Sequence, residues 1–214
     1  MDKEKDYTKE FKDLYLPSNK PMIIDVPEMT FFAVDGKGDP NTSIEYKNAM
    51  EILYGLTFTI KMSKMNRTQP EGYFEYKVPP LEGLWWFDVK EMDELGYLEK
   101  DKFYWTSMIR QPEFVTMEVF EWAKDILLKK KPEIDLSKAQ YKTFTEGTCA
   151  QIMHYGPYDN EQESINKLQQ FINENGYIVD FSDTRKHHEL YINNPQRTKP
   201  ENLKTVIRYP VKKA

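Results

Sequence analysis

Cysteine and histidine are scarce in this chain. Of its 214 residues one is a cysteine, Cys149, and three are histidines. A single cysteine excludes an intramolecular disulfide framework. Cys149 lies in the apolar alternation "TCAQIMHY" without a basic neighbour in sequence, so we expect a buried structural thiol rather than a nucleophile. His187 and His188 are adjacent in a strand-like segment and diverge to opposite faces, so we predict neither a metal site nor a cofactor.

The chain also lacks an excess of basic residues. It has 30 Lys and Arg against 35 Asp and Glu, a net charge of -5 and a pI near 5.4. Binding to a nucleic-acid backbone draws on clustered basic residues, so we expect no direct nucleic-acid partner. The one dense basic run, Lys129 to Lys131, precedes Pro132 and indicates the end of a helix whose negative pole it complements.

Long apolar runs and several common motifs are missing as well. The first residues, "MDKEKDYTKEF", lack the apolar region of a signal peptide, and no stretch approaches the ~20 apolar residues of a membrane span. We therefore expect a cytoplasmic protein without a membrane partner. The glycines of "DGKGDP" are not followed by the Gly-Lys-Ser/Thr of a phosphate-binding loop, and a G-x-S-x-G nucleophile elbow is absent.

Hydrophobic and aromatic residues are abundant, at 39% and 14% of the chain, which is ample for a packed core. In the first half the pattern predicts a strand at 30–40, a helix at 41–64, strands at 71–89 and 101–112, and a helix at 113–132. Gly55 is expected to weaken the first helix.

A similar order of elements recurs in the second half. The pattern predicts a strand or hairpin at 141–159, a helix at 159–176, and two closing strands at 187–194 and 204–211. Asp159 and Gln162 form a candidate capping box for this helix, and "NG" at 175–176 is a strong helix stop. The chain thus contains two copies of strand, helix, strand, strand, and a bridging helix follows the first copy.

This order predicts an α+β fold. We expect the two strand-helix-strand-strand repeats to form a pseudo-twofold antiparallel sheet, with helices on one face and a central ligand cleft. The whole chain, 1–214, is interpreted as a single domain. Residues 20–131 form the first repeat with its bridging helix, and residues 132–214 form the second repeat.

Glu189 is an unexpected acid in the strand-like segment "HHELYI". Successive side chains of a strand alternate between faces, so Glu189 and Tyr191 point one way while His188, Leu190 and Ile192 point the other. If the Leu190 face packs under the helices, Glu189 and Tyr191 face the cleft. The alternative that a strand glutamate simply points outward into solvent stays open at this point.

Aromatic residues are candidates to line the same cleft. They are Tyr73, Phe74, Tyr76, Trp85, Trp86, Tyr104, Trp105 and Tyr155. Stacked aromatic walls bind flat apolar molecules, and their electron-rich faces attract cations at about 0.5 to 2 kcal/mol per contact. With one carboxylate, such a cleft suits a flat, lipophilic and often cationic ligand. Ordinary core or interface packing is the alternative reading of these aromatic strands.

Two stretches resemble the GyrI-like small-molecule-binding family. "MHYGPYDNEQESINKLQQFI" resembles its H-x-G-P-Y strand-turn-helix step, and "HELYINNPQRTKPENLKTVIRYPV" resembles its closing pattern. The resemblance covers roughly residues 20–214. It implies a fold that multidrug-sensing transcription regulators use to hold lipophilic cations on aromatic residues around a buried glutamate, with which Glu189 aligns. The first twenty residues are too few for a helix-turn-helix, so direct regulation of transcription is not expected.

The tryptophan-rich strands "GLWWFDV" and "FYWTSM" resemble the stand-alone branch of this family, some of whose members hydrolyse cyclopropane-bearing DNA-alkylating compounds. That resemblance implies a detoxifying hydrolase with Glu189 and Tyr191 as catalytic residues. Glu189 would act as general base or stabilise positive charge, with its pKa lifted toward neutrality by aromatic surroundings, and Tyr191 would donate a hydrogen bond to the ligand carbonyl. The substrate-binding residues would be Tyr73, Tyr76, Trp85, Trp86, Trp105 and Tyr155.

Two other functions remain open from the sequence. The protein could sequester or sense aromatic cations without chemistry, with Glu189 as the counter-charge. It could also pair with a macromolecular partner, as the family's namesake does with a DNA topoisomerase, although no feature of the sequence supports this.

Overall fold

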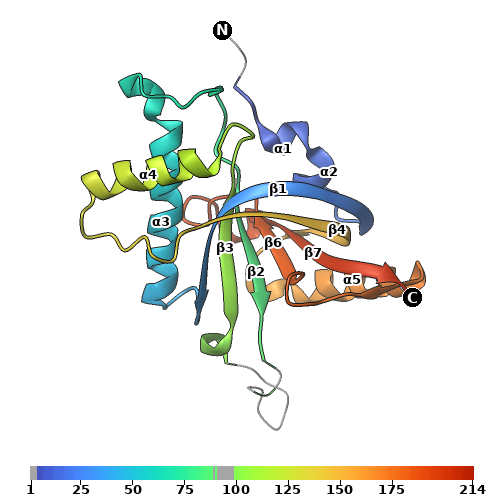
Figure 1. Ribbon diagram of the computed structural model, residues 1–214. Helices are drawn as coiled ribbons and strands as arrows, with labels where there is room; N and C mark the ends of the chain where they lie inside the picture. Colours follow the sequence, from blue (N-terminus) through green and yellow to red (C-terminus); the bar gives the residue numbers. More distant parts are fainter. Residues whose placement is uncertain (1–3, 89, 91–98) are drawn as a thin grey trace. The chain divides into compact units, whose positions relative to one another are not determined.

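The computed structural model describes residues 4–88, 90 and 99–214 (Figure 1). The chain divides into two compact units that alternate along the sequence. The first unit comprises Met1–Asp6, Met29–Pro79 and Trp85–Thr143. The second unit comprises Tyr7–Glu28, Pro80–Leu84 and Phe144–Ala214. Three strands contribute residues to both units, so the units do not coincide with the two halves of the sequence.

The first unit is built on antiparallel pairing between two strands. Strand β1 (Met22–Lys37), from Met29 onward, pairs with β3 (Tyr104–Arg110), in a register that runs from Phe31 opposite Arg110 to Lys37 opposite Tyr104. Both predicted strands are confirmed. Strand β2 (Leu81–Trp86) places its last two residues in this unit.

The prediction of strand over 71–89 is wrong for its first part, because within the described residues 71–88 the strand is β2, which begins at Leu81; residue 89 lies outside the described residues. Before β2, Tyr76 makes one isolated bridge with Lys5. The rings of Tyr73, Phe74 and Tyr76 instead pack against Phe114 at centroid distances of 5.3, 5.2 and 5.9 Å. The aromatic character that suggested a strand therefore reflects burial of rings and not a backbone ladder.

Helices α3 (Ile44–Lys61) and α4 (Met117–Lys130) complete the first unit and cross each other in Figure 1. Their N-caps are Ser43 and Thr116, whose hydroxyls accept backbone N–H bonds at 3.2 and 3.4 Å. Short 3-10 turns lie at Ser63–Asn66 and Lys100–Lys102.

Gly55 was expected to weaken α3 because of its low helix propensity, but the helix is continuous through this position. A Cβ at this position would lie 2.9 Å from a terminal methyl carbon of Leu127 on α4. Glycine therefore allows the two helices to approach closely, and this packing compensates for its conformational entropy.

The second unit is organised around β7 (Lys204–Lys213), which pairs antiparallel with three strands. These are β4 (Gln140–Tyr155), β5 (Tyr177–Val179) and β6 (His187–Tyr191). The segment predicted as a strand or hairpin is one continuous strand, β4, whose residues from Phe144 onward belong to this unit. The extra short strand β5 was not predicted.

Helix α5 (Gln162–Glu174) packs through Leu168 and Ile172 against a core that includes Ile152 of β4 and Ile207 of β7. The helix stop is confirmed, since Asn175 is the C-cap and Gly176 has φ of 71°.

The proposed capping box at the start of α5 is wrong. The N-cap is Glu161, and no side-chain capping bond is formed there within the described chain. Asp159 lies earlier, inside a 3-10 turn at Tyr158–Asn160 that carries the chain into the helix. A further 3-10 turn lies at Pro200–Asn202.

Two one-turn helices, α1 (Tyr7–Glu10) and α2 (Lys12–Tyr15), begin the second unit. They are too short to show a helical period in sequence, and their buried residues Tyr7, Leu14 and Tyr15 reveal their packing only in the structure. No helix within residues 4–88, 90 and 99–214 has the length and apolar character needed to cross a membrane.

The order of elements is the predicted one, β1–α3–β2–β3 followed by α4, and then β4–α5–β5–β6–β7. Helices and antiparallel strands occur in both units, so the α+β class is confirmed. The second copy departs from the expected pattern only by the short strand β5.

Candidate functional site

Strand β6 separates its side chains onto two faces, as predicted. His188 and Leu190 are buried, whereas His187, Glu189 and Tyr191 are partly exposed. In the register with β7, Glu189 lies opposite Ile207. Residues directly opposite in an antiparallel pair share a face, so Glu189 is on the face where Ile207 packs against α5.

This arrangement differs from the expected one, in which the Leu190 face lies under the repeat helices. The helix α5 packs on the Glu189 face, and the turn that leads into the helix lies beside β6, since the Tyr158 ring contacts the Tyr191 ring. The opposite face of β6 is closed by the segment that contains α1 and α2, since Arg208, opposite His188, donates to the Leu14 carbonyl at 2.9 Å.

Glu189 is held by its two neighbours on the same face of β6. The Tyr191 hydroxyl donates a hydrogen bond to one carboxylate oxygen at 2.7 Å. His187 Nε2 lies 2.9 Å from the other oxygen, at ion-pair distance but without the alignment of a hydrogen bond. The Tyr158 ring meets the Tyr191 ring edge-on, with centroids 5.7 Å apart.

Glu161 is a second carboxyl group of this site, and the sequence interpretation missed it. It is 8% exposed, and its Oε1 has no hydrogen-bond partner among the described residues. Burial, together with the negative charges of Glu189 and Asp159, raises the pKa of Glu161 to about 9. Glu161 is therefore a neutral acid at pH 7.

The pKa of Glu189 is shifted in the opposite direction. Burial alone would raise it, but the interactions with His187 and the Tyr191 hydroxyl hold it below its usual value. The expectation that aromatic surroundings lift the pKa of Glu189 toward neutrality is thus wrong, because polar partners outweigh burial. The raised carboxyl is Glu161, and the pair is divided into one acid and one ionised carboxylate.

Aromatic residues of the second unit extend the same face. Tyr209, on β7, lies 5.1 Å from the His187 ring and 5.1 Å from the Phe181 ring, measured between centroids. Burial and the nearby charges of Glu189 and Glu161 raise the pKa of Tyr209 to about 12, so it remains a neutral phenol. We call Glu161, His187, Glu189, Tyr191 and Tyr209, with Tyr158, the two-glutamate site.

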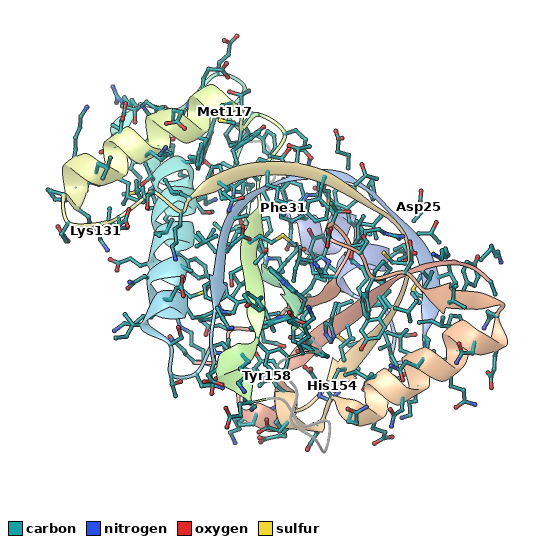
Figure 2. All side chains as sticks on the ribbon, turned by 60° about the horizontal axis from the view of Figure 1, so that its bottom comes forward. Asp25, Phe31, Met117, Lys131, His154 and Tyr158 are labelled. Carbon is teal, nitrogen blue, oxygen red and sulfur yellow. The ribbon has the colours of Figure 1, made fainter. Side chains whose placement is uncertain are left out.

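His154 connects the turn before this site to the start of α5, and Figure 2 shows it near Tyr158 at that end of the helix. Its Nδ1 lies 3.0 Å from Ser164 Oγ, and its Nε2 lies 3.2 Å from the Pro157 carbonyl oxygen. A carbonyl only accepts, so Nε2 carries the proton and donates. His154 thereby ties together residues on both sides of Glu161, which explains the histidine of the H-x-G-P-Y stretch.

The structure separates Tyr155 from the two-glutamate site within the second unit. His154 is opposite Thr205, which is opposite Tyr191, so His154 shares the Glu189 face. Tyr155, one residue further along β4, points to the other face. The residue is 53% exposed, and the Lys204 ammonium lies 5.7 Å from its ring centroid.

The remaining predicted aromatic residues belong to the first unit. They are Tyr73, Tyr76, Trp85, Trp86 and Trp105. Tyr76 is fully buried in the ring cluster with Tyr73 and Phe114. Trp105 is also fully buried and lies against Gly36, where any Cβ would collide with the indole. These contacts give Tyr76 and Trp105 an evident packing role.

Two of the tryptophans of the first unit are more accessible. The Trp86 ring stacks on Tyr104 with centroids 5.9 Å apart and planes 14° apart, and the Lys37 ammonium lies 4.4 Å from the Tyr104 centroid. Trp85 lies 6.3 Å from the Tyr46 ring of α3. The Trp86–Tyr104 stack is thus an aromatic surface of the kind that binds flat molecules.

Other features of the structure offer fewer groups that could bind or react with a ligand. A shallow depression of about 500 Å³ is lined by residues 10–14, 22–25 and 27, and none of the residues of the two-glutamate site lines it. Within the part of the chain that the structure describes, no three His, Cys, Asp or Glu side chains are grouped so as to hold a metal ion. Cys149 is buried, and burial raises the pKa of its thiol, as expected of a structural cysteine.

The chain as a whole is similar to known proteins. The GyrI-like small molecule binding domain matches residues 19–212, so the chain belongs to the GyrI-like family. No match is found among curated proteins.

Solved structures from Listeria innocua are similar over nearly the whole chain. One, described as a hydrolase, is 44% identical with a TM-score of 0.87, over 98% of this chain and 100% of the other. Another, described as an uncharacterized conserved protein, is 46% identical with a TM-score of 0.91 and the same coverage. The EcmrR C-terminal domain, at 15% identity and a TM-score of 0.51 over 91% of this chain and 98% of the other, shares the fold.

Proposed function

We propose that this protein hydrolyses cyclopropane-bearing, DNA-alkylating aromatic compounds and thereby detoxifies them. The observation that carries the proposal is the partly buried Glu189 carboxylate, which accepts a 2.7 Å hydrogen bond from the Tyr191 hydroxyl, together with a second carboxyl group, Glu161, whose pKa is raised to about 9 by burial and by the charges of Glu189 and Asp159. Hydrolysis requires a group that takes a proton from water and a group that protonates the product, and this pair supplies both. Similarity to a Listeria innocua protein described as a hydrolase supports an enzymatic role.

In the proposed reaction, Glu189 removes a proton from water as the water oxygen attacks the cyclopropane CH2 carbon. The C–C bond of the strained ring breaks, and its electron pair moves through the conjugated ring system to the carbonyl oxygen. Glu161 donates its proton to that oxygen, directly or through Tyr191, so the product is a phenol that carries a primary alcohol. Each proton-transfer group of this kind contributes about 10²- to 10⁴-fold to the rate.

Binding of the substrate in this proposal uses aromatic surfaces and charge. Tyr158 and Tyr191, with their rings edge-on, present partly exposed aromatic surface next to Glu189. An ionised carboxylate next to aromatic rings also attracts a cationic ligand. Among the aromatic residues of the first unit, the Trp86–Tyr104 stack is the surface best suited to bind a flat molecule, whereas Tyr76 and Trp105 are buried.

The proposal is tested by incubating purified protein with a duocarmycin-like cyclopropane alkylator and following the ring-opened product by mass spectrometry. We expect product from the wild type and a loss of at least about 100-fold in rate for Glu189→Gln and for Glu161→Gln. Glu174→Gln, at an exposed position near the end of α5, is the matched control and should retain the wild-type rate. Equal rates for wild type and Glu189→Gln would contradict the proposal.

A second candidate function is binding without chemistry, in which the protein sequesters or senses aromatic cations. It is favoured by the ionised state of Glu189, which is a ready counter-charge, and by the small-molecule-binding character of the family. In this case the alkylator is retained intact by the wild type, and Glu189→Gln weakens binding of cationic ligands but not of neutral ones.

A further inference from the structure

A second group of charged residues lies on the opposite face of strand β6, entirely inside the second unit. Its four members come from four strands and are between 0% and 3% exposed: Glu82 on β2, Glu146 on β4, His188 on β6 and Arg208 on β7. We call these four residues the buried charge network. None of them is part of the two-glutamate site.

His188 is at the centre of the network. Its Nδ1 lies 3.0 and 3.1 Å from the two carboxylate oxygens of Glu146, and its Nε2 lies 3.0 Å from an oxygen of Glu82. The Glu146 carboxylate, whose pKa is lowered to about 2 by His188 and Arg208 despite its burial, only accepts hydrogen bonds, so Nδ1 carries a proton, and the raised pKa of the ring makes it an imidazolium at neutral pH. Burial would lower the pKa of His188, but the two carboxylates raise it to about 9.

The network is closed by further hydrogen bonds. Arg208 donates to Glu146 at 3.1 Å, to Gln151 at 2.9 Å and to the Leu14 carbonyl at 2.9 Å. The Tyr15 hydroxyl donates to Glu82 at 3.3 Å. Two acidic and two basic side chains are thus hydrogen-bonded to one another, and α2 adds the Tyr15 hydroxyl and the Leu14 carbonyl to the network.

Buried ion networks contribute little stability compared with apolar packing, so their presence calls for another explanation. The position of His188 supplies one, because it immediately precedes Glu189 in β6 and is hydrogen-bonded on both sides. A side chain that is anchored at both ring nitrogens fixes the backbone from which Glu189 projects. The His188 charge is also among the interactions that favour the ionised form of Glu189.

We propose that His188 is a positioning residue for Glu189. Held as an imidazolium on the buried face, it fixes strand β6 and adds positive charge that favours the ionised Glu189 carboxylate, alongside His187 and Tyr191. The inference rests on the proposed function only in giving Glu189 the part of the base.

Several titratable groups lie near His188 and Glu189 and influence the protonation states of both residues. Around His188 they are Glu82 of β2, Glu146 of β4, Arg208 of β7 and Tyr15 of α2. Around Glu189 they are His187 and Tyr191 of β6, Glu161 at the start of α5 and Tyr209 of β7. The test must therefore follow individual residues and not the pH dependence of the whole protein.

The first measurement is a ¹⁵N NMR titration of histidine side chains in the wild-type protein. We expect both ring nitrogens of His188 to remain protonated at pH 7.5 and the ring to lose its proton near pH 9. A His188 ring that is neutral at pH 7.5 would overturn the proposal. This measurement requires no variant and does not depend on turnover.

The second measurement is a ¹³C NMR titration of the Glu189 carboxyl group in variants. His188→Gln leaves two buried carboxylates facing one cation, so the double variant Glu82→Gln/His188→Gln, in which one carboxylate and one cation remain, is the robust form of the test. We expect the Glu189 titration in the double variant to lie about one pH unit above that in Glu82→Gln alone, as for a carboxylate that loses a nearby cation. Lys212→Gln removes an exposed charge from β7 and should cause no shift.

A Glu189 titration that is the same in the folded double variant as in Glu82→Gln alone would show that His188 has only a structural role and would overturn the proposal. Failure of the proposed function gives a different result: the wild type makes no ring-opened product, while the two NMR titrations still behave as expected. The His188 inference and the hydrolase proposal can therefore fail separately.

Discussion

Strand β6 has one face built around Glu189 and another built around His188, and the two faces differ in how their charges are partnered. On the buried face, every charged side chain of the network has hydrogen-bond partners on more than one side. On the Glu189 face, a carboxyl oxygen of Glu161 has none among the described residues, and two carboxyl groups compete for one proton. A network in which every polar group has a hydrogen-bond partner makes a structure rigid. A buried polar group without a partner is free to bind a ligand or take part in a reaction.

The largest effect on stability should come from removing one partner from the buried charge network. Arg208→Met leaves Glu146 buried without its guanidinium partner, and such a loss is expected to cost about 3 to 5 kcal/mol of unfolding free energy. Urea unfolding monitored by tryptophan fluorescence measures this loss. Lys212→Met, on an exposed part of the same strand, is the control and should change stability by less than about 0.5 kcal/mol. Similar values for the two variants would mean that the network is not important for stability.

The next effect concerns the proton on Glu161. The pKa of Glu161 is about 9 in the folded state and ordinary, about 4.5, in the unfolded state. Between these two pH values the folded state binds more protons than the unfolded state. The free energy of unfolding therefore falls as pH rises from about 4.5 to 9. Glu161→Gln removes this dependence, and the variant should gain stability relative to the wild type at pH 8 while turnover is lost. Urea unfolding at pH 5 and pH 8 provides the check, and a variant destabilised equally at both pH values would contradict it.

His188 also makes the free energy of unfolding fall as pH rises, over a narrower range of pH. Its pKa is raised from 6.5 to about 9, so its stabilising contribution is complete below pH 6.5 and is lost as pH rises through 9. In a Glu161→Gln background, the remaining decrease in stability above pH 7 should therefore follow the His188 titration measured by NMR. A stability curve that is flat between pH 7 and pH 9.5 in this background would contradict the charge assigned to His188.

A smaller change is expected from Tyr191→Phe. The variant keeps the ring against Tyr158 but removes the hydroxyl that donates to Glu189 at 2.7 Å, a bond worth about 1 kcal/mol. The pKa of Glu189 should rise, and turnover should fall about fivefold, consistent with that energy. Carboxyl ¹³C titration and product formation measure the two effects. Loss of turnover as complete as in Glu189→Gln would instead make Tyr191 a proton donor in the reaction.

The smallest effect should come from Tyr155→Ala. Tyr155 points away from the Glu189 face of β4, so affinity for a fluorescent aromatic cation should change less than about threefold, well below the effect of losing a buried contact. Fluorescence anisotropy measures the affinity. A tenfold loss would place Tyr155 in the ligand site, as the resemblance to the family first suggested.

Much of the fold could be predicted from local pattern. The helical spacing of α3 and the asparagine–glycine stop of α5 are short-range signals, and both correspond to elements of the structure. The segment at 71–80 shows where this reasoning fails. Its aromatic residues have strand character, but their rings are used in a cluster with Phe114, a residue that is distant in sequence.

The candidate site was predictable only in part, for a related reason. Alternation along β6 correctly paired Glu189 with Tyr191 and separated both from His188. Glu161 has no such local signal, because an acid at the start of a helix is ordinary on electrostatic grounds. Its raised pKa arises from burial and from Glu189 on another element, so the opposite shifts of the two carboxyl groups could not be read from either segment alone.

The sequence by itself determined the order of strands and helices, the alternation that puts an acid and a phenol on one face of β6, and the membership of a small-molecule-binding family. Only the tertiary structure decided which charges meet. His188 reaches Glu82 across 106 residues and Glu146 across 42, through strand pairing that local pattern does not encode. Protonation states depend on these long-range neighbours and on burial, which is why the opposite pKa shifts of Glu161 and Glu189 and the charge on His188 could be inferred only from the folded chain.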